Sequence, residues 1–415
     1  MLDIKFIREN PSQIQKAAES KGITVSIDHL LEIDRKYREL SLEVQTLREE
    51  RNKYAKEKNI EKGRELKEKL EKDEHVLSAI KEELDRNLRE VPLPPLPDVT
   101  NEDIEIKKVG EPKKFDFKPK DHLDLGESLD IIDVQRAAKV SGTRFAYLKN
   151  EGVLLEFALV QFAMETLRKE GFTPVIPPVL IKKEITDKLG YWNGGGNEDY
   201  YLVVEPGDTD TPKELFYLIG TAEHALVPMH EGEVLNKKDL PKRYVGFSSA
   251  FRREAGTYGK DTRGILRVHQ FDKVEMISYT TEENDSEEHE ALLSIEEKLF
   301  QALKIPYRVV KIKIMDLGFP IAKKYDIEAW LPGQDQYREM TSVSTTLDFQ
   351  ARRLNIKYQD GPEKKYTHIL NGTAFAIGRT IIAILENYQQ EDGSVLIPEV
   401  LQKYLPKTTK ITPKK

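Results

Sequence analysis

The sequence contains no cysteine among its 415 residues. This absence excludes disulfide bonds, thiolate zinc sites and a cysteine nucleophile together. The sequence also lacks an apolar run long enough to span a bilayer, and its first residues do not show the basic-then-apolar pattern of a signal peptide. We therefore expect a soluble, cytoplasmic protein that has no membrane segment.

The charge balance is only weakly acidic. The sequence has 72 acidic and 65 basic residues, which gives a net charge of −7. This value neither predicts nor excludes a nucleic-acid partner, because binding to phosphates needs a local basic surface and not a basic protein.

Residues 28–90 contain no proline and only one glycine, Gly63. Apolar residues recur three and four positions apart in two runs of this stretch, which indicates a coiled-coil seam and one antiparallel helical hairpin over about residues 27–92. We expect the turn at 59–63, since a glycine can leave a helix at little steric cost. The seam residues are Leu30, Ile33, Tyr37, Leu40, Val44, Leu47 and Tyr54, then Leu66, Leu70, Leu77, Ile80, Leu84 and Val91.

A lone hairpin buries one narrow seam, so we expect it to project as an arm. Between Arg48 and Lys72 there are ten lysines and arginines against seven glutamates. This excess suits an RNA backbone, although a solvated surface or an ordinary oligomerisation coiled coil would look similar.

The remainder of the chain alternates between strand-like and helical runs. Tyr307–Ile314 and Ile327–Leu331 are typical of strands, and Leu154–Lys169 and Ser286–Leu303 are typical of helices, which together predict a mixed α+β domain. The prolines at 92, 94, 95 and 97 predict a stiff connection, and we expect the tail, Pro406–Lys415, to be frayed. The expected organisation is a helical N-terminal region over 1–98, a linker over 99–120 and a larger domain over 121–415.

The stretch Phe251–Glu275 is the richest in cations. Its two ends, Tyr244–Arg252 and Leu266–Met276, can each form a strand, with a loop marked by glycines 256, 259 and 264 between them. The guanidinium fork of arginine suits phosphate and carboxylate oxygens, and Phe271 offers a ring face to a purine. Composition alone also allows a surface hairpin with solvated charges. The six cations are Arg252, Arg253, Lys260, Arg263, Arg267 and Lys273.

Two familiar kinds of site are not supported. No Gly-x-x-x-x-Gly-Lys-Ser/Thr loop occurs in the sequence, which excludes a Walker-type ATP site. His224 and His269 have no cysteine or second histidine at ligand spacing, so we expect packed or exposed histidines and not metal ligands.

Five ordered motifs carry a resemblance to a known family. Residues 251–275 (FRREAG, DTRG, RVHQFDKVE) resemble motif 2 of the class II aminoacyl-tRNA synthetases, in the version of the bacterial-type seryl-tRNA synthetases. Gly171–Pro178 resembles motif 1, and Asn371–Arg379 with the apolar helix that follows resembles motif 3. Thr221–Glu223 and Arg338–Ser344 are typical of the seryl branch. The resemblance covers essentially the whole chain, including the hairpin.

The resemblance implies an architecture and a reaction. The fold would be an antiparallel sheet flanked by helices, in a homodimer built through motif 1 and Pro178. The reaction would be ATP-dependent activation of L-serine to seryl-adenylate with release of pyrophosphate, followed by transfer to the 3′ end of tRNA(Ser). The N-terminal hairpin would grip the long variable arm of that tRNA, and tRNA(Sec) is a second candidate substrate.

The resemblance also implies residue roles. Arg252 would bridge the α-phosphate and the serine carboxylate, and Arg267 would hold the γ-phosphate; these are the two catalytic candidates. Glu254 would accept a hydrogen bond from the adenine amino group, while Phe271 and Arg379 would sandwich its ring. The full ATP-binding set is Arg252, Arg253, Glu254, Arg267, Val268, Phe271, Glu339, Met340, Thr341, Ser342 and Arg379.

Serine and magnesium have their own implied residues. Glu339 and Ser342 would supply hard oxygen ligands to Mg²⁺. Glu275 would be the natural partner of the serine ammonium and hydroxyl groups. The serine-binding set is Thr221, Ala222, Glu223, Arg252, Glu275, Asn371 and Thr373, and departures from the common bacterial pattern occur at His224, Arg253, Val343 and Thr345.

Two alternative functions are open to this family resemblance. A related ligase that charges a carrier protein would lack the long arm, which this sequence has. An inactive paralogue that acts as a binding scaffold would lack motif arginines or the metal carboxylate, but Arg252, Arg267, Arg379 and Glu339 are all present.

Overall fold

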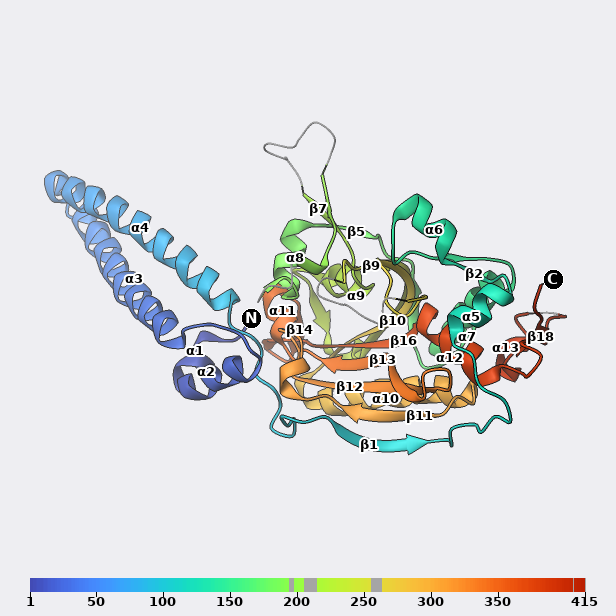
Figure 1. Ribbon diagram of the computed structural model, residues 1–415. Coiled ribbons are helices and arrows are strands. Elements are labelled where there is room, and N and C mark those ends of the chain that lie inside the picture. Colours follow the sequence, from blue (N-terminus) through green and yellow to red (C-terminus); the bar gives the residue numbers. More distant parts are fainter. Residues whose placement is uncertain (194–197, 205–214, 255–262, 406, 415) are drawn as a thin grey trace. The chain divides into compact units, whose positions relative to one another are not determined.

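The computed structural model describes residues 1–193, 198–204, 215–254, 263–405 and 407–414. The chain forms two compact units, Met1–Pro94 and Pro95–Lys415, and the boundary between them lies within the proline-rich stretch. Figure 1 shows the helices and strands of both units.

The first unit is entirely helical. Two short helices, α1 (Ile4–Glu9) and α2 (Pro11–Ser20), precede the long α3 (Ile27–Lys56) and α4 (Ile60–Arg89). α3 and α4 pair as the expected antiparallel hairpin (Figure 1). In its seam, buried side chains of both helices form an apolar cluster whose members are Leu40, Val44, Leu47, Leu66, Leu70 and Leu77.

The turn of the hairpin differs from the prediction. Asn59 is the N-cap of α4, and its side chain accepts a hydrogen bond from the Lys62 amide. Gly63 therefore lies inside the first turn of α4, and the change of direction occurs before it, where Lys58 has a φ of 56°. The turn thus lies close to the predicted position but is made by residues 57–59, and Gly63 does not end a helix, because the capping asparagine starts α4 before it.

The second unit is built on an eight-stranded sheet. Its strand order is β1-β11-β12-β13-β16-β10-β9-β4, and every pair is antiparallel except β4–β9. This sheet with its flanking helices confirms the expected α+β architecture of an antiparallel sheet flanked by helices. The strands are β1 (Ile104–Val109), β4 (Thr173–Val175), β9 (Lys242–Phe251), β10 (Gln270–Thr280), β11 (Tyr307–Lys311), β12 (Lys323–Leu331), β13 (Gln336–Thr345) and β16 (His368–Ala376).

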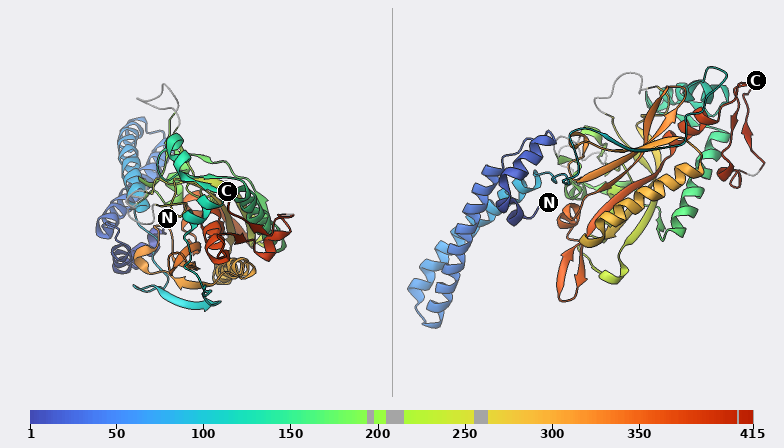
Figure 2. Two further views of the ribbon diagram at one scale, coloured as in Figure 1. Left: turned by 45° about the vertical axis from the view of Figure 1, so that its right-hand side comes forward. Right: turned by 90° about the horizontal axis from the view of Figure 1, so that it is seen from below.

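Three helices pack on one face of this sheet. They are α7 (Glu151–Lys169), α10 (Asp285–Ala302) and α12 (Ile377–Tyr388), and Figure 2 shows α10 running along the strands. Their apolar side chains join those of the sheet in one core, which includes Leu159, Phe300, Ile381, Met276 and Phe375. The opposite face of the central strands carries buried polar side chains such as Glu275 and Thr373, and farther along the same strands Ile277, Tyr279 and Ile369 join a second apolar cluster.

Smaller elements surround the sheet. The helices are α5 (His122–Ser128), α6 (Val134–Ser141), α8 (Lys183–Leu189), α9 (Glu223–Leu226), α11 (Phe349–Leu354) and α13 (Glu399–Gln402). The strands are β2 (Ile132–Asp133), β3 (Tyr147–Leu148), β5 (Leu180–Lys182), β6 (Leu202–Val203), β7 (Phe216–Leu218), β8 (Val234–Asn236), β14 (Lys357–Asp360), β15 (Glu363–Tyr366), β17 (Val395–Leu396) and β18 (Lys410–Ile411). Within the described ranges, no helix combines the length and apolar character that crossing a membrane requires.

Two segments are more ordered than the sequence suggested. Residues 104–109, inside the expected linker, form the edge strand β1 and pair with β11. In the tail, β18 pairs with β17, and Ile411 is buried in the main core. The expectation of a frayed tail is wrong over residues 410–411. The buried side chain of Ile411 and the pairing of both residues with β17 hold this part of the tail in place.

Candidate active site

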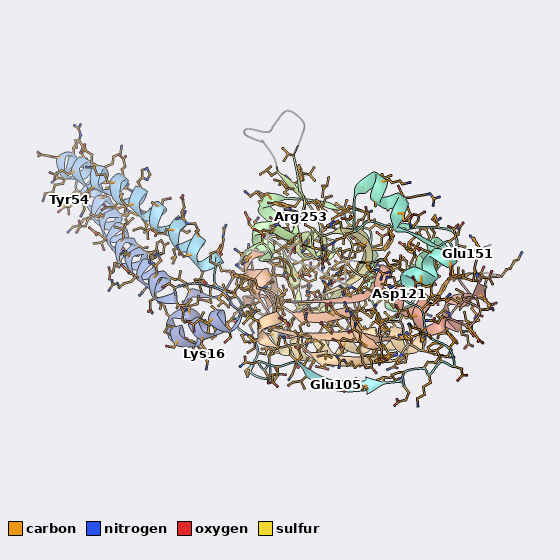
Figure 3. The ribbon with its side chains drawn as sticks, viewed as in Figure 1. Lys16, Tyr54, Glu105, Asp121, Glu151 and Arg253 are labelled. Atoms are coloured by element: carbon orange, nitrogen blue, oxygen red, sulfur yellow. The ribbon has the colours of Figure 1, made fainter. Side chains whose placement is uncertain are left out.

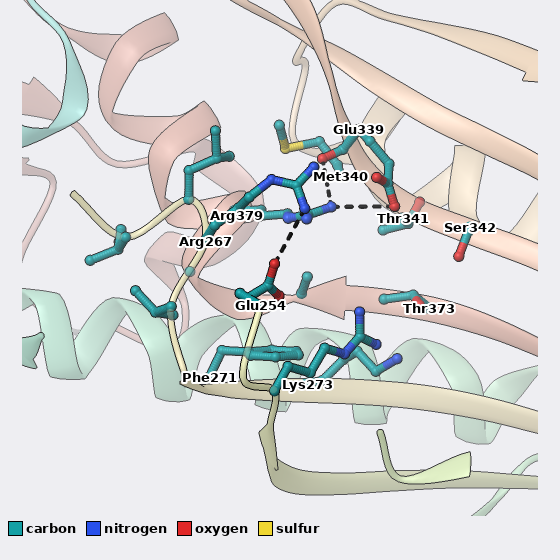
Figure 4. Close-up of a pocket in the computed structure, with 16 residues that line it drawn as sticks. Glu254, Arg267, Phe271, Lys273, Glu339, Met340, Thr341, Ser342, Thr373 and Arg379 are labelled. Atoms are coloured by element: carbon teal, nitrogen blue, oxygen red, sulfur yellow. Dashed lines mark hydrogen bonds and ion pairs between the residues drawn. The ribbon is translucent and has the colours of Figure 1, made fainter. Parts of the chain in front are cut away.

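A cleft of about 610 Å³ opens on the polar face of the central strands. Every member of the expected ATP-binding set except Arg253 lines it, as do Thr373 and Lys273 (Figure 4). The lining residues are Arg252, Glu254, Ile265, Leu266, Arg267, Val268, Phe271, Lys273, Glu339, Met340, Thr341, Ser342, Thr373, Ala376, Gly378 and Arg379.

Arg252 is held at the end of β9. Its Nε donates to the carbonyl of Gly220 at 3.0 Å, and its guanidinium lies 5.3 Å from the centre of the Phe271 ring. The backbone amide of Arg252 donates to the carbonyl of His269. These contacts fix a guanidinium beside an aromatic face, where it can attract anions.

Glu254 and Arg267 face each other across the cleft. Arg267 Nη1 lies 3.4 Å from Glu254 Oε2 (Figure 4). Glu254 has a φ of 49°, and its carbonyl accepts a hydrogen bond from Arg144. The resemblance assigns these two residues to different parts of ATP, and in this structure they contact each other.

Glu339 and Arg379 form a second pair. Arg379 Nη1 donates to the Glu339 carbonyl at 3.1 Å and lies 3.3 Å from its Oε1 (Figure 4). Burial favours the neutral form of Glu339, but the positive charges of Arg379, Lys324 and Arg252 outweigh it and lower its pKa to about 2. Glu339 is therefore an anion at neutral pH.

Glu275 lies on β10 beside the cleft and is only 2 % exposed. Its Oε2 accepts a hydrogen bond from Thr373 Oγ1 at 3.1 Å and lies 2.6 Å from Lys273 Nζ. Lys273 is itself only 6 % exposed. A carboxylate, a hydroxyl and an ammonium group thus meet at one buried point.

Glu223 is a second buried carboxyl group. It accepts hydrogen bonds from Tyr191 Oη at 2.6 Å and Gln350 Nε2 at 3.3 Å. Burial raises its pKa to about 7, and the negative charge of Glu275 acts in the same direction. The Glu223 amide donates to Thr221 Oγ1 at 3.4 Å.

The remaining residues of the expected serine set surround this point. Ala222 is fully buried, as the N-cap of α9. Asn371 is buried on β16, and its Nδ2 has no hydrogen-bond partner among the residues that the structure describes. The cleft and this polar cluster share Arg252, Lys273 and Thr373, so the two expected sets lie next to each other.

Some expected residues lie elsewhere. Arg253 is exposed, and its amide donates to the carbonyl of Asp199 (Figure 3). Lys260 and the glycines at 256 and 259 lie outside the described residues. His224 is buried among aromatic rings, with its Nδ1 accepting from the Gly220 amide, and His269 Nδ1 donates to the carbonyl of Arg252.

Lys273, Tyr191 and Gln350 belong to the site although no motif in the sequence assigns them to it. Lys273 had a detectable signal, because Phe271, Lys273 and Glu275 alternate along β10 and therefore share one face. Tyr191 and Gln350 had none, since they reach Glu223 from segments 32 and 127 positions away in the chain.

Comparisons with known proteins agree with one another. A family model described as "Seryl-tRNA synthetase N-terminal domain" matches residues 1–94, and one described as "tRNA synthetase class II core domain (G, H, P, S and T)" matches residues 202–388. The serine–tRNA ligase of Dictyoglomus thermophilum is 46% identical to this chain, with 100% of both sequences covered. That of Pyrococcus horikoshii is 44% identical, with 97% of this chain and 96% of the relative covered.

Solved structures give the same result. The crystal structure of seryl-tRNA synthetase from Pyrococcus horikoshii complexed with ATP has a TM-score of 0.92 and 41% identity, with 100% of both chains covered. The cytoplasmic serine–tRNA ligase of Naegleria fowleri in complex with AMP has a TM-score of 0.90 and 32% identity, with 100% of this chain and 99% of that chain covered.

Proposed function

Because the chain belongs to the serine–tRNA ligases, a family of aminoacyl-tRNA synthetases, we propose that its cleft holds ATP and L-serine next to each other and joins them. The enzyme activates L-serine to seryl-adenylate with release of pyrophosphate and then transfers serine to tRNA. The observation that carries our assignment is the position of Arg252, which lines the cleft and acts electrostatically on Lys273 and Glu339. From that position one guanidinium reaches both the α-phosphate and the serine carboxylate.

ATP occupies the cleft with its adenine on the Phe271 ring and Arg379 over the other face of the base. Entry of ATP separates Glu254 from Arg267. Glu254 then accepts from the adenine amino group, and Arg267 holds the γ-phosphate. The Glu254–Arg267 distance of 3.4 Å supports this exchange, since a long, partly exposed ion pair is weak and easily replaced.

Glu339 and Ser342 would hold Mg²⁺ together with the phosphates, and the ion would supply charge neutralisation as phosphoryl charge builds up. The residues fit the ion, because an ionised carboxylate and a hydroxyl are hard oxygen donors. Among the residues described, no group of three or more histidine, aspartate or glutamate side chains can hold a metal.

Serine binds at the buried cluster, with its carboxylate on Arg252, its ammonium group between Glu275 and Glu223, and its hydroxyl beside Thr373 and Thr221. Alanine is rejected because the loss of the hydroxyl leaves buried polar groups unpaired. The burial of Glu275, Glu223 and Thr373 supports this mode of selection.

The enzyme acts as a homodimer through motif 1. Three apolar side chains of that region are exposed in the single chain: Leu154 (51 %) and Phe157 (52 %) on α7, and Ile176 (86 %) two positions before Pro178. Burial of apolar side chains in a subunit interface stabilises association. A second copy of the chain would cover them.

The hairpin α3–α4 binds the long variable arm of tRNA(Ser). A second candidate substrate is tRNA(Sec). The enzyme works in the cytoplasm. Support comes from the lysines and arginines between Arg48 and Lys72, which lie on a hairpin with little buried surface. Recognition by shape and phosphate contacts needs cations that remain in solvent.

Two assays on the purified enzyme test the assignment. We expect serine-dependent exchange of pyrophosphate into ATP, followed by transfer of labelled serine to tRNA(Ser). Absence of exchange from a folded enzyme would refute the proposed cleft chemistry. Exchange without transfer would favour a carrier-protein substrate instead of tRNA.

A further inference from the structure

Four charged side chains lie together beside the cleft: Glu223, Glu275, Arg252 and Lys273. Lys273 Nζ and Glu275 Oε2 are 2.6 Å apart, and both side chains are almost fully buried. The two carboxyl groups and the two cations act on one another electrostatically. In the absence of substrate, Lys273 therefore compensates the charge of Glu275.

Serine brings a second cation to the same carboxylate. If the roles proposed above are right, the serine ammonium group needs Glu275, which already contacts Lys273 and Thr373. Two ammonium groups at one buried carboxylate repel each other at short range. One of them must move, and the side chain of lysine can do so because its charge stands on a flexible four-carbon stem.

ATP bound in the cleft would offer Lys273 a second anionic partner. Lys273 lines the ATP cleft together with Arg252 and Thr373, on the same face of β10 as Phe271. Burial lowers the pKa of Lys273, and the charge of Arg252 adds to that effect while Glu275 opposes it. A buried cation of this kind needs an anionic partner in every state of the enzyme, and the α-phosphate would be the nearest new one.

We propose that Lys273 stands in for the serine ammonium group in the free enzyme and is displaced by serine onto the α-phosphate of ATP. Each substrate then strengthens the binding of the other, because serine frees the cation that ATP requires. Arg252 bridges the two substrates directly, whereas Lys273 couples them by changing partner. This inference rests on the proposed positions of serine and ATP.

The alternative is a static ion pair. In that case Lys273 only neutralises Glu275 and stabilises the sheet, and it keeps this contact throughout the reaction. A static pair and an exchanging one differ in a single measurable quantity, the factor by which serine changes the affinity for ATP.

Calorimetry with α,β-methylene-ATP, which cannot release pyrophosphate, measures this factor in a stable ternary complex. In the wild-type enzyme we expect saturating serine to tighten analogue binding by about tenfold, a typical coupling between two sites. In Lys273→Met we expect the factor to fall to within about twofold of unity. Lys242→Met, at the start of β9 and away from the cleft, is the matched control and should couple like the wild type. Wild-type coupling in Lys273→Met would overturn the proposal.

Lys273→Arg covers the case in which the methionine variant does not fold. It keeps the buried positive charge, but its fork can hold the Glu275 carboxylate with two hydrogen bonds. We expect serine to bind at least about tenfold more weakly in the absence of nucleotide. Unchanged serine affinity would indicate the static pair. Serine-dependent pyrophosphate exchange by the wild type keeps the proposed function separate, since it can succeed when this coupling fails.

Discussion

The charged side chains between Arg48 and Lys72 on the hairpin lie largely in solvent, whereas Lys273 and Glu275 on the polar face of the sheet are buried and paired. Arg48–Glu74 and Lys69–Glu43 connect α3 and α4 through side chains that are about half exposed. Such pairs contribute about 0–1 kcal/mol each. By contrast, Lys273–Glu275 is buried on both sides, and breaking one partner of a buried pair costs about 3–5 kcal/mol.

Exposed and buried charges therefore suit two different kinds of ligand. Each solvated cation can change its ion-pair partner independently of the others, so these cations can contact a large anionic partner. Buried charges must balance one another and whatever ligand enters, so they hold small charged substrates in fixed positions. The first arrangement suits a tRNA backbone, and the second suits the meeting of ATP with an amino acid.

The largest loss of activity should come from a substitution among the charged residues of the cleft. In Arg252→Ala we expect serine-dependent pyrophosphate exchange to fall by about 10³-fold, the upper range for loss of one preorganised donor to developing charge. Arg48→Ala, on the exposed side, should leave exchange unchanged. Exchange in Arg252→Ala within tenfold of the wild type would show that Arg252 does not bridge the substrates.

Shortening the hairpin should impair tRNA charging and spare pyrophosphate exchange. We expect deletion of residues 52–72, closed by a short glycine–serine turn, to lower tRNA charging by about 100-fold, equivalent to about 2.7 kcal/mol. Pyrophosphate exchange should stay within about twofold of the wild type, because the deleted residues belong to the first unit alone. If charging survives the deletion, the hairpin does not bind the tRNA.

A single substitution on α7 tests the homodimer. In Phe157→Asp we expect subunit association, measured by sedimentation, to weaken by at least about tenfold, because an interface would have to bury an unpaired carboxylate. Met315→Asp, at a similarly exposed apolar residue elsewhere, is the control. Equal association of the two variants would place the dimer interface away from motif 1.

The hairpin could be predicted from sequence because its information is local. A heptad pattern fixes which face of each helix is buried, and both long helices were located from it. The error at the turn was also local, since Asn59 and Gly63 compete to define the same helix end. In the sheet, long-range pairing decides the outcome. β1 pairs with β11, about 200 positions later in the chain, and no property of the sequence near Ile104 specifies that partner.

The site divides in the same way. The resemblance supplied the residues of the cleft, but it did not show which charges are buried against each other. The sequence analysis placed Lys273 among six similar cations, and only the depth of β10 in the sheet distinguishes it from exposed Arg253. Contacts such as Tyr191 with Glu223 depend on the folded arrangement of separate segments, which the spacing of motifs does not determine.

Substitution of Glu296 should have the smallest effect of these variants, and it tests the protonation state of one buried carboxyl group. It lies on α10, fully buried between that helix and the helix-covered face of the sheet, and its Oε2 accepts a hydrogen bond from Thr341 Oγ1 at 2.6 Å. Burial raises the pKa of Glu296 well above its usual value, and the charges of Glu275 and Asp326 act in the same direction. Gly372 leaves room for this carboxyl group, since an added Cβ there would lie 3.0 Å from Glu296 Oε1.

A carboxyl group whose pKa is higher in the folded state stabilises the fold most at low pH, and that contribution is lost as the pH rises through the folded-state pKa. Glutamine has the same shape and cannot ionise. In Glu296→Gln we therefore expect a midpoint of thermal unfolding within about 2 °C of the wild type at about pH 6, and a difference in favour of the variant that grows toward about pH 9. Glu287→Gln, exposed on the same helix, should match the wild type at both values. If the wild type instead gains on Glu296→Gln as the pH rises, the fold stabilises the ionised form, and the folded state lowers the pKa of Glu296 instead of raising it.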